Sequence, residues 1–507
     1  ETQFGNYNKT YLWILDNLAE LYTRMNQYEK ASQLFVEASK IRKRIIYDSF
    51  KYLSPSEVDG LIKTFKRGIN LFNAFLINCP QPKNELLLEA YDNELFYKGF
   101  SLNYQLEVNN LIGTNKKNQE LHDSLKSYCK LLSKEFLKST PNKDYAAKLN
   151  QTIRGLEQRL CLNLSGYNRF IRTVRFGELK TKLKTGESVV EISYINTSTD
   201  IKIDSCQYIA FVFDSKSTAP SLIKLGSESQ LTQLFPKSEV LKADYVNAIY
   251  GVASRGFEPI QQANANNLYQ FLIQPLLPAL KNTKIIYYAP SGGLHKINIQ
   301  AIPVSGAKVF GQNFNVIQLA SGRDLNHIQT TAYRLKNAHL FGGINYYMKD
   351  SNAHRNYIQG NEIASRSITG LNCIKTSNAD WPELKHTQSE ILQIGSLLKK
   401  SGMQVKSYLG SEASETQFNK LGEGKPSPDI IHLATHGYFI SKDQLIKSNP
   451  QTDSFQSIKN QPMLRSGLIL ANGFKTWQSG PQEFLNSNDG VLTALEVSQM
   501  DLKNTKL

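Results

Sequence analysis

The pattern of apolar residues changes near Thr185-Gly186, and this change restricts the possible folds more than any other feature. Before it, apolar residues recur at three- and four-residue steps, which is typical of one face of a helix. After it, short runs rich in Val, Ile and aromatic residues alternate with helical stretches. Such alternation indicates strands joined by helices. The sequence therefore predicts an α-helical N-terminal region followed by an α/β domain with a mainly parallel sheet.

The clearest helical pattern covers residues 11–45, with a short break at Met25–Gln27. Its small and aromatic residues resemble the tetratricopeptide (TPR) repeat of about 34 residues. An ordinary helical hairpin is the alternative interpretation. Because one repeat cannot bury its faces alone, we expect earlier repeats before Glu1 and interpret residues 1–50 as the end of a longer array. The matching positions are Leu18, Ala19, Tyr22, Tyr28, Ala31, Phe35 and Ala38.

Helical patterns continue through residues 51–180, which we interpret as a connecting region without distinct chemistry of its own. Residues 181–507 are predicted to form the α/β domain. The predicted helices are Ser56–Leu76, Asn84–Ile112, Asn118–Leu137, Asn142–Arg175, Asn264–Ile273, Ser389–Lys400 and Ser414–Leu421. The predicted strands are Ser188–Tyr194, Gln207–Phe213, Ile285–Ala289, Ala338–Phe341, Gln404–Tyr408, Asp429–Ala434 and Leu468–Leu470.

Charge and cysteine content exclude several classes of protein. The net charge is +15, from 59 basic and 44 acidic residues, but no run of five like charges occurs. Only this net charge favours nucleic-acid binding, so direct binding is disfavoured. Five scattered cysteines form no CxxC pair, which indicates free thiols in a reducing compartment and predicts a cytoplasmic protein. No apolar run approaches the ~20 residues of a membrane span, so we expect no membrane partner.

The segment Ile430–Gly437 carries the clearest chemical signal. A short apolar strand ends in His436-Gly437, where glycine permits a sharp turn and a close approach to a ligand. Three interpretations of the histidine stay open on these residues alone: a structural role, metal binding with His432, or acid–base chemistry. The metal interpretation is the weakest, because Leu433 stands where a zinc peptidase has glutamate and the segment does not resemble a helix.

This segment resembles the histidine motif of CHAT proteins, which are relatives of caspases and separase associated with TPR repeats. Further weak matches follow one order across about residues 265–507. Of these, Asp489–Ala494 is the most specific. The others are Leu268-Tyr269 with Leu272 and Pro275, Pro290–Leu294 with Ile297–Ile302, Leu319–Leu325, Leu340–Ile344, Leu384 with Thr387 and Glu390, Tyr408–Gly410 with Ala413–Glu415, and Arg465–Ala471.

The resemblance implies a caspase-like cysteine endopeptidase in which His436 is the general base and the N–H of Gly437 stabilises the oxyanion. In this family the nucleophilic cysteine follows the Asp489–Ala494 motif closely, so it is expected beyond Leu507. The five cysteines of this chain do not stand in such a context; Cys373, in particular, is interpreted as a packed thiol. The chain alone is therefore expected to be inactive, and the complete protein to need no metal or organic cofactor.

The resemblance also implies partners. A protein or peptide is the expected substrate, and a protein partner is expected to bind the TPR region and regulate cleavage. A role in bacterial defence follows only by analogy of architecture. The alternative is a TPR scaffold that carries a catalytically inactive caspase-like domain.

Overall fold

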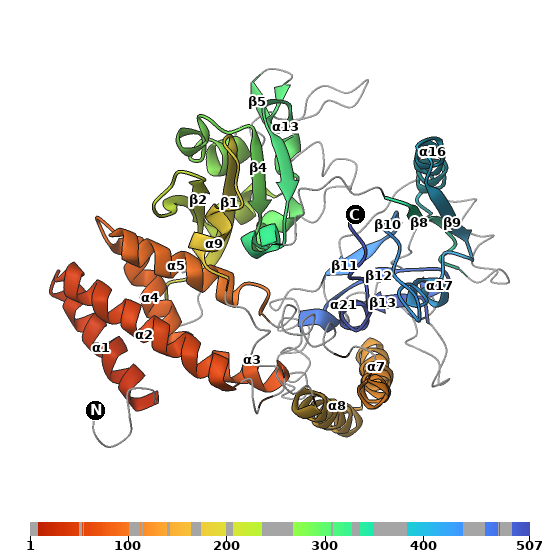
Figure 1. Cartoon of the computed structure of the whole chain (residues 1–507), viewed down its shortest axis with the longest axis horizontal. Coiled ribbons are helices and arrows are strands. Elements are labelled where there is room, and N and C mark those ends of the chain that lie inside the picture. The colour runs from red at the N-terminus through yellow and green to blue at the C-terminus, as the bar shows by residue number, and fades with distance from the viewer. Residues whose placement is uncertain are drawn as a thin grey trace. The chain divides into compact units, whose positions relative to one another are not determined.

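The computed structural model contains two compact units, which are shown in Figure 1 and described separately. The first unit combines residues 1–104 with 168–331, and the second combines residues 105–167 with 332–507. The structure describes residues 9–49, 53, 55–100, 112, 115–138, 142–163, 174–198, 206–235, 267–305, 308–326, 335–347, 383–439, 462–474, 476 and 489–507.

The first unit begins with a helical hairpin, α1 (Lys9–Arg24) and α2 (Tyr28–Ser49). Ala19 of α1 and Ala31 and Ala38 of α2 are fully buried, because small side chains allow the two helices to approach closely. The predicted hairpin is therefore present, while its identity as a TPR repeat stays a prediction. Three more helices follow: α3 (Pro55–Thr64), α4 (Lys66–Asn78) and α5 (Asn84–Tyr97).

The continuous helix predicted from Ser56 to Leu76 is wrong, because the chain breaks between α3 and α4 at Phe65. The break lets α4 pack against both helices of the hairpin. A buried ion pair between Asp16 of α1 and Arg42 of α2, with an oxygen–nitrogen distance of 2.5 Å, lies directly beside Gly68 of α4. Only glycine leaves room for this pair at the three-helix contact.

The first unit also holds a five-stranded sheet in the order β3-β2-β1-β4-β7. Its strands are β1 (Glu187–Asn196), β2 (Cys206–Asp214), β3 (Ser221–Ser227), β4 (Ile285–Ala289) and β7 (Asn315–Gln318). β1, β4 and β7 are parallel, whereas β1–β2 and β2–β3 are antiparallel. The prediction of a mainly parallel sheet is therefore wrong, and the sheet is mixed. The physical reason is the length of the connections between β1, β2 and β3, which are shorter than the dozen or so residues of a parallel crossover.

Alternating residues of this sheet face two different cores. Val189 of β1 packs with the helices α1, α2, α4 and α5, whereas its neighbour Val190 packs with residues 268–316 on the opposite face. Both faces are thus covered, as expected for a sheet with parallel strands at its centre. The smaller elements of this unit are α9 (Phe176–Lys180), α10 (Glu228–Leu234), η3 (Tyr269–Ile273), η4 (Leu277–Leu280), η5 (Gly292–Lys296), η6 (Ile299–Ala301), β5 (Pro303–Ser305), β6 (Lys308–Val309), α13 (Phe310–Asn313) and η7 (Gly322–Asn326).

The second unit contains two small sheets. The first is wholly parallel, in the order β10-β8-β9, and the second is antiparallel, in the order β11-β12-β13. The bounds are β8 (Asn337–Ile344), β9 (Gln404–Gly410), β10 (Ile430–Leu433), β11 (Gly437–Phe439), β12 (Ser466–Ile469) and β13 (Val491–Thr493). The helices are α7 (Lys116–Leu137), α8 (Lys143–Asn163), α16 (Thr387–Lys400), α17 (Glu415–Asn419), α21 (Ala494–Ser498) and η9 (Pro462–Leu464).

Two helices of the second unit come from far earlier in the chain. α7 and α8 form a hairpin, and α7 packs against α21 near the end of the chain. A hydrogen bond of 3.0 Å between the hydroxyls of Ser133 and Thr493 joins them. None of the helices that the structure describes is both long enough and apolar enough to cross a membrane.

Candidate functional site

His436 lies where the chain leaves the parallel sheet. The amide of Ala434 still donates to Phe341 of β8, which extends the parallel pairing past β10. The carbonyl of His436 instead accepts from Ile469 of β12, so the next residues form β11. This change of sheet places His436 at the carboxyl ends of parallel strands, where sites form in α/β proteins. Its side chain is buried, with 6% of its surface exposed.

Tyr346, which follows β8, is the aromatic neighbour of His436. The two ring centroids lie 5.0 Å apart, with the planes tilted by 53°. The hydroxyl of Tyr346 lies 3.1 Å from that of Thr435. Burial raises the pKa of Tyr346, although hydrogen bonds with Thr435 and with the backbone of His436 oppose this shift. The phenol therefore stays neutral near pH 7 and anchors the segment that carries the histidine. No sequence pattern indicates a role for this tyrosine, because it lies outside the segment Leu340–Ile344 that matched the family pattern.

Gly437 begins β11 and lies opposite Leu468 of β12. Because Ile469 donates to the carbonyl of His436, Gly437 and Leu468 form a non-hydrogen-bonded pair. The N–H of Gly437 is therefore directed away from β12. An added Cβ at this position would lie 3.4 Å from the carbonyl oxygen of Gly467, which is an ordinary van der Waals contact, so packing alone does not require glycine here. The position is compatible with an amide that donates to a ligand.

His432 has different surroundings from His436. Its Nε2 lies 3.0 Å from a carboxylate oxygen of Glu390 on α16, and both side chains are partly exposed. The interpretation of His432 and His436 as a metal pair gains no support from this arrangement. A search of the described residues found no group of three or more His, Cys, Asp or Glu side chains that could hold a metal ion.

The residues that end at Leu507 run alongside β10. The amides of Lys506 and Leu507 donate to Asp429, at 2.7 and 3.2 Å, and the amide of Ile431 donates to Leu507 at 2.7 Å. In a parallel pair, one residue bonds to the two residues that flank its partner. Leu507 bonds in this way to Asp429 and Ile431, which flank Ile430. Leu507 is therefore level with Ile430, on the side of β10 opposite to β8.

A buried carboxylate, Glu415 of α17, fixes the Asp489–Ala494 segment in this unit. Its oxygen accepts from the amides of Asp489 and Gly490, at 2.7 and 2.9 Å, and Lys130 of α7 lies 3.3 Å away. Burial, and then the charge of Glu415, raises the pKa of Asp489 to about 7 and that of Glu496 to about 8. The sequence matched Glu415 to the family pattern but showed no role for it, because its partners are backbone amides distant in the chain.

Together, a buried histidine at the end of a parallel strand and a glycine amide beside it define a candidate site at the edge of an α/β sheet. The comparison with families is more specific. The CHAT domain family model matches residues 262–507, so this part of the chain is similar to the CHAT domain. This confirms the resemblance found in the motifs. No curated protein matches the chain.

The match leaves some predictions untested. Residues 1–50, predicted as a TPR repeat, lie outside it. Cys373 lies within it but outside the residues that the structure describes, as does most of the predicted long loop between Tyr438 and Asn488. The catalytic roles of His436 and Gly437 also stay predictions.

Proposed function

We propose that the protein acts as a cysteine endopeptidase in which His436 is the general base and the nucleophilic cysteine follows Leu507. The observation that carries the proposal is the parallel pairing of Leu507 with β10. If the chain continues as a strand in this register, a residue about six positions beyond Leu507 is level with His436. A cysteine at that level would meet the imidazole at the same sheet edge.

The proposed mechanism uses groups with defined surroundings. The imidazole of His436 accepts the thiol proton, and the resulting thiolate attacks the carbonyl carbon of the scissile peptide bond. The N–H of Gly437 donates to the oxyanion that develops. The imidazolium then gives its proton to the leaving amine, and water hydrolyses the thioester to return the free enzyme. The proposal needs neither a metal nor an organic cofactor.

The partners proposed for this activity are a protein or peptide substrate and a regulatory protein that binds residues 1–50. The support for regulation is the helical hairpin that precedes the CHAT domain. A cytoplasmic location and a role in bacterial defence belong to the same proposal and rest on cysteine content and on analogy of architecture.

The test uses a protein that continues past Leu507 and a library of fluorogenic peptides. We expect His436→Ala to lower kcat/KM at least about a hundredfold, because general base catalysis is lost. The matched control is His432→Ala, which removes the histidine bonded to Glu390. We expect it to retain near wild-type cleavage. Replacement of the cysteine that lies level with His436 by serine should abolish cleavage.

Two results would contradict the proposal. The first is equal loss of activity in the two histidine variants, which would remove the special role of His436. The second is a continuation without a cysteine near the level of His436, which would favour a binding protein with an inactive caspase-like domain.

A further inference from the structure

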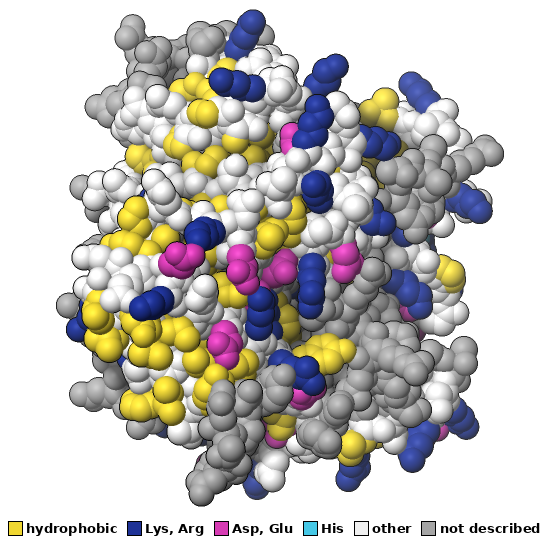
Figure 2. Space-filling model, turned by 60° about the vertical axis from the view of Figure 1, so that its left-hand side comes forward, with side chains coloured by type: hydrophobic (Ala, Val, Ile, Leu, Met, Phe, Trp, Pro, Cys, Tyr) yellow, Lys and Arg dark blue, Asp and Glu magenta, His cyan; other side chains and the backbone are white. Residues whose placement is uncertain are grey.

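The exposed surface of the helical region does not indicate a class of ligand. On the side of the molecule that carries the N-terminal helices, Figure 2 shows basic and acidic side chains mixed with apolar ones. Ion pairs such as Lys40–Glu85 and Lys83–Glu29 join exposed side chains of opposite charge. The buried surroundings of His436 in the second unit are more specific, because their contacts involve the histidine itself.

Three main-chain hydrogen bonds hold Tyr346 in place. The amide of the preceding residue, Asn345, donates to Gly410, the last residue of β9, at 3.2 Å. The carbonyl of Asn345 accepts from the amide of Asn472 at 3.1 Å, and that of Tyr346 accepts from Phe474, also at 3.1 Å. Tyr346 is only 1% exposed. It is therefore fixed between the end of a parallel strand and the residues that follow β12.

The phenol of Tyr346 belongs to a directional chain of hydrogen bonds. The hydroxyl of Thr435 donates its single proton to the carbonyl of Ile469, so the phenol must be the donor to Thr435, 3.1 Å away. Burial raises the pKa of Tyr346 and a backbone bond from His436 opposes this rise, which makes the amide N–H the donor. The carbonyl of His436 accepts from Ile469 at 2.9 Å. Both main-chain groups of the histidine are thus engaged.

The ring of Tyr346 contacts the imidazole of His436. The centroid distance of 5.0 Å and the tilt of 53° are typical of favourable aromatic pairs. In a packed interior a side chain turns only where its neighbours leave room, and His436 is 6% exposed. A general base needs its lone pair directed at the proton that it takes. In Ser–His–Asp triads a carboxylate holds the imidazole in such an orientation.

We propose that Tyr346 is a positioning residue for His436. Its hydroxyl fixes the main chain of the histidine, and its ring restricts the imidazole to the orientation in which it accepts the thiol proton. The effect on catalysis rests on the proposed function, whereas the restriction of the imidazole is a property of the folded chain and is measured without cleavage. The hydroxyl and the ring are separable, because phenylalanine retains the ring and leucine retains neither.

The first measurement is the mobility of the imidazole, by nuclear magnetic resonance of the full chain labelled with ¹³C in its histidine rings. The chain has eight histidines, and the signal that is lost in His436→Ala identifies the relevant one. We expect an order parameter of about 0.85 in wild type and in Tyr346→Phe, and below about 0.6 in Tyr346→Leu. Tyr346→Met, whose flexible side chain fills space with less strain, repeats the test if Tyr346→Leu does not fold.

The matched control is Tyr347→Leu. Tyr347 is the next residue and is also buried, but its ring packs on Phe474, with centroids 4.4 Å apart. We expect this variant to lose stability in urea, as Tyr346→Leu does, and to keep a rigid imidazole at His436. The comparison separates the loss of a buried tyrosine from the loss of the one that contacts the histidine.

The second measurement is peptide cleavage by the protein that continues past Leu507. We expect Tyr346→Leu to lower kcat about a hundredfold with little change in KM, because a displaced catalytic group raises the barrier but leaves substrate binding intact. Tyr346→Phe should lower kcat less than about tenfold, since it removes one hydrogen bond. Tyr347→Leu should retain a kcat near that of wild type.

Three results would overturn the positioning role: an imidazole that stays rigid in Tyr346→Leu, equal effects of the two leucine variants on mobility and kcat, or an unchanged kcat in Tyr346→Leu. Failure of the proposed function gives a different result. In that case the wild-type protein does not cleave peptides, while Tyr346→Leu still mobilises the imidazole and Tyr347→Leu does not.

Discussion

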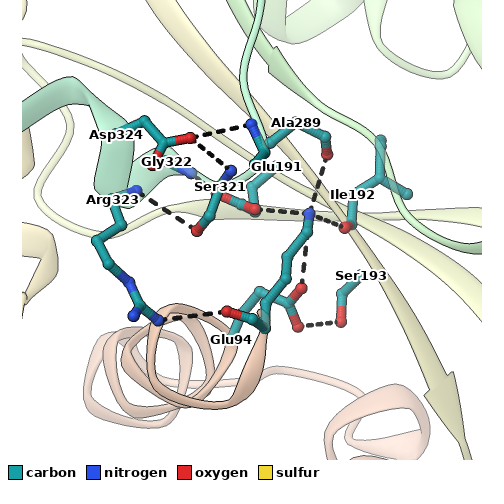
Figure 3. Close-up of polar contacts among 11 residues, drawn as sticks. Glu94, Glu191, Ile192, Ser193, Ala289, Ser321, Gly322, Arg323 and Asp324 are labelled. Carbon is teal, nitrogen blue, oxygen red and sulfur yellow. Dashed lines mark hydrogen bonds and ion pairs between the residues drawn. The ribbon is translucent and has the colours of Figure 1, made fainter. Parts of the chain in front are cut away.

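At the residue scale, Lys98 has the most unusual surroundings. Its side chain is only 12% exposed and its ammonium donates to Glu191, to the carbonyl of Ile192 and to that of Ala289. All three donors of the ammonium are used. The position marks where β1 and β4 cease to pair, because Glu191 and Ala289 are their last paired residues. The lysine ammonium therefore bridges β1 and β4 at the point where their pairing ends (Figure 3).

The first prediction concerns Lys98→Met. This change leaves the fully buried carboxylate of Glu191 without its cation, and we expect the free energy of unfolding to fall by about 3–5 kcal/mol. Urea unfolding of the full chain measures it. The control is Lys40→Met, which removes an exposed ion pair with Glu85 and should cost less than about 1 kcal/mol. Similar losses in both variants would show that burial of the Lys98 pair is not what matters.

The second prediction concerns pH and Glu496. Burial, and then the charge of Glu415, raises the pKa of Glu496 to about 8 in the folded state. The ordinary value is 4.5, so between the two values the folded protein holds a proton that the unfolded chain releases. The unfolding free energy must therefore fall as pH rises from about 5 to 8 and then level off, by up to about 1.4 kcal/mol per pH unit for one such group.

Urea titrations at a series of pH values measure this slope. Glu496→Gln should make it shallower, because the variant side chain has no proton to lose, and the remaining slope comes from groups such as Asp489. Glu85→Gln is the control, since its side chain is 70% exposed, and it should leave the slope unchanged. A slope that is the same in wild type and Glu496→Gln would refute the assignment.

At the scale of elements, glycine decides how α4 packs. An added Cβ at Gly68 would lie 2.7 Å from the guanidinium of Arg42 and closer still to the carboxylate of Asp16. Gly60 of α3 is also helical, yet an added Cβ there meets nothing within 4 Å. Alanine substitution at the two positions therefore distinguishes the effect of helix propensity from the effect of packing.

The third prediction uses this pair. Gly68→Ala should lower the melting temperature, because it pushes apart a buried ion pair whose disruption costs several kcal/mol. Gly60→Ala should raise the unfolding free energy by about 0.5–1 kcal/mol, since alanine is the better helix former. Thermal unfolding followed by circular dichroism measures both. Stabilisation by Gly68→Ala would mean that the three helices have room to shift.

The local sequence pattern predicted many helices and strands well, but it did not predict how the strands pair. The strand at Ile285–Ala289 was predicted with its observed bounds, because five apolar residues stand between polar turns. The direction of pairing could not be predicted, since the composition of β1 and β2 does not distinguish a parallel pair from an antiparallel one. β7 was missed because Asn315–Gln318 is short and half polar. Direction and short strands are decided by tertiary contacts that single segments do not carry.

The candidate site shows the same division. The end of a strand at His436 was readable from the apolar residues before it. The roles of Tyr346 and Glu415 could not be predicted, because they arise from contacts between residues distant in the chain. Tyr346 contacts Thr435, and Glu415 accepts from the amides of Asp489 and Gly490. The direction of the Gly437 amide depends on pairing with β12, which no local pattern reveals.

At the scale of the whole molecule, the CHAT match and the compact units divide the chain differently. The match covers residues 262–507, whereas its first part, up to 331, belongs to the first unit. In that unit β4 pairs with β1 on one side and β7 on the other. In the second unit α7, from before the match, packs on α21. Residues outside the match therefore complete the core of both of its parts.

The last prediction follows from this division. A fragment of residues 262–507 loses β1 beside β4 and loses the hydroxyl of Ser133 that bonds with Thr493. Tyr288, fully buried in the full chain, would then face water beside an unpaired strand edge. We expect the fragment to show weak near-ultraviolet circular dichroism and no cooperative urea transition, whereas the full chain unfolds cooperatively. Protected amides in Ile285–Ala289 of the fragment would contradict this expectation. They would show that the matched residues build their own core without the helices and strands that precede them.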